Sequence, residues 1–157
     1  MKVVKNPLKA LAVALVISGM AVISLESSSE SLPIKFYSFE EGFKVAEKED
    51  KLVLVYVHSD TCHVCKAFLE DLSKYEDLQK VFKKFVVVKV DFLRERTLAT
   101  KLGATGTPEF YVFYPNGTLV EVKGRKAIYI GYSPVPDDEA ARKSLIAFLE
   151  KVLESAG

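Results

Sequence analysis

The sequence is short of cysteine, of histidine and of any excess charge, and each shortage excludes a class of protein. Only two cysteines occur among 157 residues, so the chain is not a small scaffold stapled by several disulfides. With 22 basic against 21 acidic residues, no strong field points to nucleic acid or an anionic membrane as the main partner. A structural zinc site commonly takes two cysteine pairs, and this chain has one pair and two histidines.

The first 25 residues have the order of a secretory signal. Lysines without any acid in residues 1–9 precede an uncharged, largely apolar run over residues 10–25, and a polar stretch over residues 26–33 follows. As a helix the apolar run would span about 24 Å, short of a bilayer core of roughly 30 Å. We therefore expect residues 1–25 to be a signal peptide, or alternatively a retained N-terminal membrane anchor, and residues 26–33 to be a linker. The protein is then exported, to the periplasm or another extracytoplasmic space.

Residues 34–157 predict a single α/β domain with a mixed sheet covered by helices on both faces. Continuous apolar runs predict buried strands at residues 52–57, 85–90 and 110–114. Shorter strands are expected at residues 34–37, 118–122 and 126–131, with a turn at 115–117. Helical periodicity predicts helices at residues 39–48, after Cys62, around 78–82, and at 94–102 and 137–154.

The two cysteines lie where a buried strand gives way to a helix, in the order Cys62-His63-Val64-Cys65. A disulfide between them closes almost no chain, so it would stabilise the fold little. Thiol–disulfide exchange needs a thiolate and a second thiol nearby. The first helical turn would favour the Cys62 thiolate through free N–H groups and the helix dipole, and would place Cys65 on the same face. We predict that Cys62 attacks and Cys65 resolves.

The neighbours of Cys62 are expected to tune it. Lowering a thiol pKa from about 8.5 to about 7 needs only about 2 kcal/mol. The helix end, protonated His63 and Lys66 can supply this. The dipeptide His63-Val64 between the cysteines sets the reduction potential.

A metal site is the alternative interpretation. His58, Cys62, His63 and Cys65 fall within eight positions, so a non-catalytic module that binds or delivers a metal such as Cu(I) through both cysteines and a histidine stays open. Ligands packed so tightly on a strand end and a helix start cannot easily converge in a tetrahedron. We therefore expect no metal, and no cofactor beyond the redox-active disulfide.

The chain resembles the thioredoxin superfamily. The resemblance is carried by the strand that leads into Cys62–Cys65, by the strand at residues 85–91 and its following helix, and by Gly106-Thr107-Pro108 before the strand at 110–114. It implies a thioredoxin-like fold, with Pro108 in the cis form facing the cysteine pair and Thr107 presenting its backbone to an extended substrate.

The resemblance also implies a function, that of a thiol–disulfide oxidoreductase acting on protein disulfides outside the cytoplasm. Because no dimerisation domain is visible, a monomeric reductase or general oxidoreductase is favoured over an isomerase. Its partners would be protein thiols or disulfides and an upstream electron donor or acceptor, such as a membrane protein. The chain would contact a membrane only through an uncleaved N-terminus, and no nucleic acid.

Three departures from cytoplasmic thioredoxin stand out. The chain has no tryptophan, so the usual Trp before the first cysteine is here Thr61. Tyr56 stands where the family has a buried acid, which puts carboxylate-assisted deprotonation of Cys65 in doubt and leaves His58 or a water as substitutes. Glu109, after Pro108, is charged where the family is mostly neutral, and we expect it to bias the choice of substrate.

Overall fold

The structure, a computed structural model, describes residues 32–156. The expected signal or anchor, and most of the expected linker, lie outside these residues. None of the described helices combines the length and the apolar character that crossing a bilayer requires.

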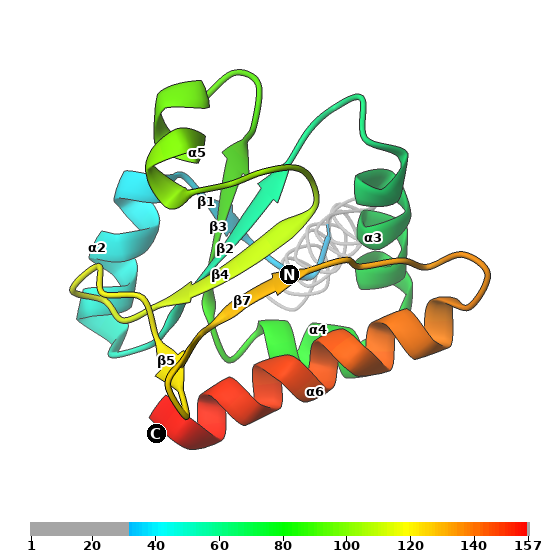
Figure 1. Ribbon diagram of the computed structural model, residues 1–157. Helices are drawn as coiled ribbons and strands as arrows, with labels where there is room; N and C mark the ends of the chain where they lie inside the picture. The colour runs from blue at the N-terminus through cyan, green and yellow to red at the C-terminus, as the bar shows by residue number, and fades with distance from the viewer. Residues whose placement is uncertain (1–31, 157) are drawn as a thin grey trace, which may run out of the picture. The chain divides into compact units, whose positions relative to one another are not determined.

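Five strands form one mixed sheet in the order β1-β3-β2-β4-β7 (Figure 1). Their bounds are β1 (Phe36–Tyr37), β2 (Val53–His58), β3 (Val86–Asp91), β4 (Glu109–Phe113) and β7 (Ile128–Ile130). β1, β3 and β2 run parallel, β4 is antiparallel to β2, and β7 is antiparallel to β4. The expected mixed sheet is confirmed.

Helices cover both faces of this sheet (Figure 1). On one face lie α2 (Phe39–Glu49) and α5 (Arg96–Leu102), and on the other lie α3 (His63–Lys74), α4 (Glu76–Phe82) and α6 (Asp138–Ala156). Side chains of β2 alternate between the two cores, with Val55 facing α2 and Tyr56 facing α3. The continuous apolar run at residues 52–57 therefore reflects burial on both faces, as expected for a central strand.

The segment after β4 differs from the expectation. Residues 118–122 were expected to be the return strand of β4. The start of this hairpin forms, with a bridge from Leu119 to Phe113, but residues 109–111 of β4 pair with β7 and not with this segment. The N–H of Val120 bonds to the carbonyl of Val112, and the chain then leaves the sheet. β5 (Glu121–Val122) and β6 (Arg125–Lys126) pair only with each other, as a separate hairpin.

The start of α5 also moves, from the expected position 94 to Arg96. Asp91 ends β3, and its carboxylate accepts the N–H groups of Leu93 and Arg94 at 3.0 and 2.9 Å. These bonds fold the residues after β3 into a turn, so the helix begins only after them.

Candidate redox site

Cys62 is the N-cap of α3, and not a residue of its first turn as expected from the sequence. Its backbone is extended, and its Sγ accepts the N–H of Cys65 at 3.1 Å. An N-cap side chain normally satisfies one of the free N–H groups at a helix start, and here sulfur takes that place. The first turn of α3 contains no acidic residue that would compete for the positive end of the dipole.

Cys62 and Cys65 form a disulfide whose Cα atoms lie 5.2 Å apart. The two sulfurs differ in access, because Cys62 is half-buried whereas Cys65 is only 2% exposed. Cys65 shares the inward face of α3 with Phe68 and Leu72. Both lie in the larger of the two cores, between the sheet and α3, α4 and α6, which is here called the main core. An incoming molecule therefore reaches the sulfur of Cys62 before that of Cys65.

The loop before β4 forms the other wall of the site. The carbonyl oxygen of Thr107 lies 3.7 Å from Cys62 Sγ, across a sequence separation of 45 residues. Thr107 is half-buried, Pro108 is buried, and the peptide bond between them is cis. The sequence-predicted residues Cys62, Cys65, Thr107 and Pro108 are thus brought together.

The expected tuning residues lie around the pair without touching the sulfurs through any described hydrogen bond. His63 and Lys66 are exposed, and the partly buried Val64 packs against the main core. The backbone N–H of Lys66 bonds to the carbonyl of Cys62 at 3.2 Å, which is the first bond of the helix. The influence of His63, Val64 and Lys66 on the thiols stays a prediction.

Glu109 is the clearest correction to the sequence analysis. Its side chain is only 2% exposed, so in this structure its charge is not presented at the surface. The carboxylate accepts bonds from the hydroxyl of Tyr111 at 2.6 Å and from the hydroxyl and N–H of Thr105 at 2.8 and 3.2 Å. Glu109 therefore ties the chain on both sides of Pro108 into the interior.

Tyr56 and His58 lie on the face of β2 that carries α3. Tyr56 is fully buried, its ring packs against those of Phe68 and Phe110, and its hydroxyl has no hydrogen-bond partner among the described residues. Burial raises the pKa of Tyr56. The ring of His58 lies 5.6 Å from that of Tyr56, and burial, followed by the charge of Lys89, lowers the pKa of His58.

Sequence reasoning missed a charged cluster beside the site. Donor atoms of His58, Asp60 and Asp91 lie within 4.8 Å of one another. Asp60 already forms an ion pair with Arg94 at 3.0 Å. The backbone N–H of Arg94, and after it that of Leu93, lowers the pKa of Asp91. The sheet topology could have revealed this cluster. β2 and β3 are parallel neighbours, so their last residues, His58 and Asp91, lie side by side.

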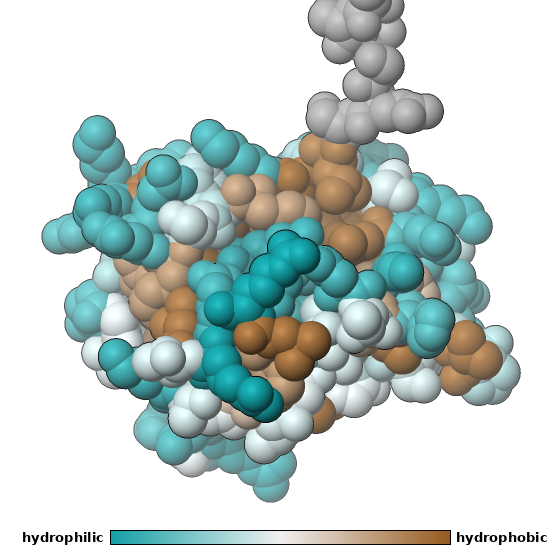
Figure 2. All heavy atoms as spheres, turned by 90° about the horizontal axis from the view of Figure 1, so that it is seen from above, coloured by the Kyte–Doolittle hydropathy of each residue, from teal (hydrophilic) through white to brown (hydrophobic). Residues whose placement is uncertain are grey.

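Exposed apolar side chains near the site were also missed. Ile130, the last residue of β7, is 60% exposed and pairs with Glu109, the residue after Pro108. Leu93, in the turn after β3, is 54% exposed. Figure 2 looks down on the edge of the sheet where β2 leads towards α3, and apolar patches lie there among hydrophilic side chains.

A mixed sheet with helices on both faces, and a cysteine pair at a helix start opposite a proline loop, define a protein of the thioredoxin class. Residues 39–127 match the thioredoxin-like domain family, and the chain belongs to that family.

Individual proteins resemble this chain in sequence or in fold. An uncharacterized protein of Archaeoglobus fulgidus is 35% identical over 85 residues, covering 54% of this chain and 66% of the relative, slightly less than two thirds of it. A thioredoxin from Thermus thermophilus has a similar structure, with a TM-score of 0.62 and 22% identity over 80% of this chain and 92% of that one. A candidate disulphide-isomerase from Bacteroides thetaiotaomicron gives 0.60 and 25%, over 82% of this chain and 100% of that one.

Proposed function

We propose that this protein is a thiol–disulfide oxidoreductase that acts on protein disulfides through Cys62 and Cys65. The observation that carries the proposal is the position of Cys62 Sγ, which caps α3 on the accessible side of a disulfide whose other sulfur is buried. The family and the fold support the same reaction.

The reaction follows from that geometry. In the reduced protein the Cys62 thiolate attacks one sulfur of a substrate disulfide, forms a mixed disulfide and releases the first substrate thiolate. Cys65 then loses its proton and attacks Cys62 Sγ, which releases the second substrate thiolate and forms the Cys62–Cys65 disulfide. Two electrons pass to the substrate, whose two thiolates take up protons from solvent, and the reverse sequence oxidises a dithiol.

The N–H of Cys65 stabilises the charge on Cys62, because it already points at Sγ from 3.1 Å. Thr107 has a different role in the proposal. Its carbonyl, 3.7 Å from the sulfur, lies at the wall along which an extended substrate would place its own backbone, and Pro108 has no N–H to compete for that substrate.

Trapping tests the assignment of the two sulfurs. The full-length protein with Cys65→Ser should accumulate mixed disulfides with a substrate such as insulin, visible on a non-reducing gel and released by dithiothreitol. The Cys62→Ser protein should trap much less, although it keeps one thiol. Equal trapping by the two variants, or more by Cys62→Ser, would show that the accessible sulfur is not the nucleophile.

We propose a reductase or general oxidoreductase in preference to an isomerase, and a monomer. The reduction potential against glutathione separates the directions. A value of about −270 mV favours a reductase, and one of about −120 mV an oxidant. Faster recovery of scrambled ribonuclease than of reduced ribonuclease would instead indicate an isomerase.

The proposed site of action is outside the cytoplasm, where protein disulfides persist. The signal-like order of residues 1–33 supports this proposal. The partners would be substrate proteins and an upstream electron donor or acceptor, such as a membrane protein. Fractionation of cells that make the full chain, with N-terminal sequencing of the recovered protein, distinguishes a cleaved signal from a retained anchor, and cytoplasmic recovery contradicts export.

A further inference from the structure

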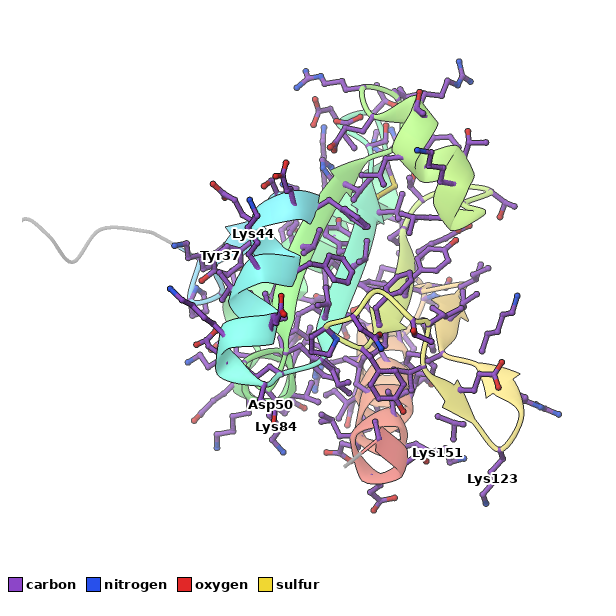
Figure 3. The ribbon with its side chains drawn as sticks, turned by 90° about the vertical axis from the view of Figure 1, so that its left-hand side faces the viewer. Tyr37, Lys44, Asp50, Lys84, Lys123 and Lys151 are labelled. Carbon is purple, nitrogen blue, oxygen red and sulfur yellow. A yellow bond between two sulfur atoms is a disulfide. The ribbon has the colours of Figure 1, made fainter. Side chains whose placement is uncertain are left out.

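The hairpin β5–β6 and the last turns of α6 border a groove of about 580 Å³, here called the basic groove. Its cations are Lys123, Arg125 and Lys126 from the hairpin and Lys151 from the helix. Figure 3 shows Lys123 at the turn of the hairpin and Lys151 on the neighbouring part of α6. Figure 1 places the hairpin at the end of the sheet away from the start of α3, so this groove is not part of the redox site.

Charge is unbalanced in the basic groove. No carboxylate is among the residues that line it, and none of its four cations forms an ion pair with a described residue. Lys126 is paired in the hairpin ladder with Glu121, but Glu121 does not line the groove. Because the whole chain has only one more basic than acidic residue, this concentration of positive charge is local.

The floor of the basic groove is apolar. Val152 is 1% exposed, and Phe148 and Val122 are partly buried against the main core. A low-dielectric floor strengthens the field of the cations above it, and it offers burial to an apolar side chain.

The turn of the hairpin contains a lysine, Lys123, in a backbone conformation that lysine rarely adopts. Lys123 and Gly124 are the two central residues and have φ values of 51° and 77°. Such a turn favours Asn or Gly at both positions, because a Cβ is crowded in the left-handed region. Lys123 thus keeps a cation at the rim of the groove where a neutral Asn would suit the backbone better.

We propose that the basic groove is a docking site for an acidic polypeptide segment that also carries a bulky apolar side chain. The carboxylates would pair with the four cations, and the apolar side chain would lie on Phe148 and Val122, which are only partly buried. The concave shape favours a polypeptide over a lipid bilayer, since a flat surface would touch the hairpin tip and leave the floor uncovered. Such a site would hold a partner while the redox site at the other end of the sheet stays free.

The test uses the oxidised full-length protein and a fluorescein-labelled peptide of glutamates around a central Phe-Leu, measured by fluorescence anisotropy. Binding should weaken as salt rises, and should weaken on replacing the glutamates by glutamine or the Phe-Leu by serines. The double variant Lys123→Glu/Arg125→Glu should bind at least about tenfold less tightly. The matched control is Lys83→Glu/Lys84→Glu, two exposed lysines outside the groove, which should change the affinity less than about twofold.

Lys123→Asn separates binding from folding. It removes one cation while suiting the turn, so the peptide should bind more weakly although the melting temperature stays equal or rises. Equal affinity of the wild type and the double charge-reversal variant overturns the proposal. So does an absence of peptide binding up to about 1 mM. Binding to vesicles of anionic phosphatidylglycerol without binding to the peptide overturns it in favour of a lipid surface.

Discussion

The buried carboxylate of Glu109 gives a prediction whose sign reverses with the background. In the variant Glu109→Leu, the hydroxyl of Tyr111 loses an acceptor 2.6 Å away and, at 2% exposure, has no access to water. An unsatisfied buried donor costs about 1–3 kcal/mol. The donors of Thr105 cost less, because Thr105 is exposed and can bond to water. We expect Glu109→Leu to lower the free energy of unfolding by about 2 kcal/mol.

Tyr111→Phe is the matched second change. In the wild type it removes a donor from Glu109 and should lower stability by about 1 kcal/mol. In the Glu109→Leu background it removes the orphaned hydroxyl, so it should raise stability by about 1 kcal/mol. Removing both partners should therefore cost about 1 kcal/mol in total, less than Glu109→Leu alone.

The assay is equilibrium urea unfolding of the oxidised protein and its variants, followed by circular dichroism and tyrosine fluorescence. Coincident transitions by the two probes establish that a two-state analysis applies. If Tyr111→Phe costs the same in both backgrounds, the two side chains are not coupled, and the hydrogen bond between them contributes nothing to stability. A parallel measurement of insulin reduction should show a rise in KM, since Glu109 holds the loop that carries Thr107.

Three further predictions concern other buried groups. Gly42→Ala should lower the free energy of unfolding by about 1–3 kcal/mol, although Ala has the higher helix propensity, because a Cβ there would clash with the side chain of Val88. Urea unfolding measures this loss, and adding Val88→Ala should restore part of it. Tyr56→Phe should raise the free energy of unfolding by about 1 kcal/mol, because the Tyr56 hydroxyl has no partner among the described residues. Tyr132→Phe should lower it by about 1–3 kcal/mol, because the Tyr132 hydroxyl donates to Asp71 at 2.6 Å. A loss for Tyr56→Phe together with a gain for Tyr132→Phe would contradict these hydrogen-bond assignments. Stability should be fully present below the ordinary tyrosine pKa of about 10 and fall above it, since burial raises the folded-state pKa of four of the seven tyrosines. The phenolate absorbance of four tyrosines should appear only together with unfolding, and ionisation of all seven before unfolding refutes the expectation. The four are Tyr56, Tyr111, Tyr129 and Tyr132.

The sequence predicts well those elements whose burial is visible in one segment. The runs at residues 52–57 and 85–90 are apolar throughout, and each became a central strand. Periodicity likewise located α6, whose Leu145, Leu149 and Val152 are buried. In these segments local pattern and tertiary environment agree.

The sequence predicts poorly what depends on a partner elsewhere in the chain. Nothing near residue 121 says that the hairpin β5–β6 leaves the sheet, because β4 could pair with either of two following segments. Cys62 was placed one residue too far into the helix, since strand-to-helix boundaries are set by capping geometry. Glu109 was expected to bias the choice of substrate, and its burial was not foreseen, because its hydrogen-bond donors Thr105 and Tyr111 meet it only in the folded loop.

During the proposed reaction Cys65 must lose its proton, and the residues at positions 56 and 58 of β2 decide where that proton can go. An ionised carboxylate at position 56 could accept that proton, but burial raises the pKa of Tyr56, so its phenol stays protonated at neutral pH and cannot take the proton up. His58 stands two residues along the same face of β2, and its lowered pKa keeps the imidazole neutral at pH 7, in the form that accepts a proton. Position 56 therefore cannot act as the base, and the proton of Cys65 is expected to leave through His58 or through water that reaches the site once the mixed disulfide has formed.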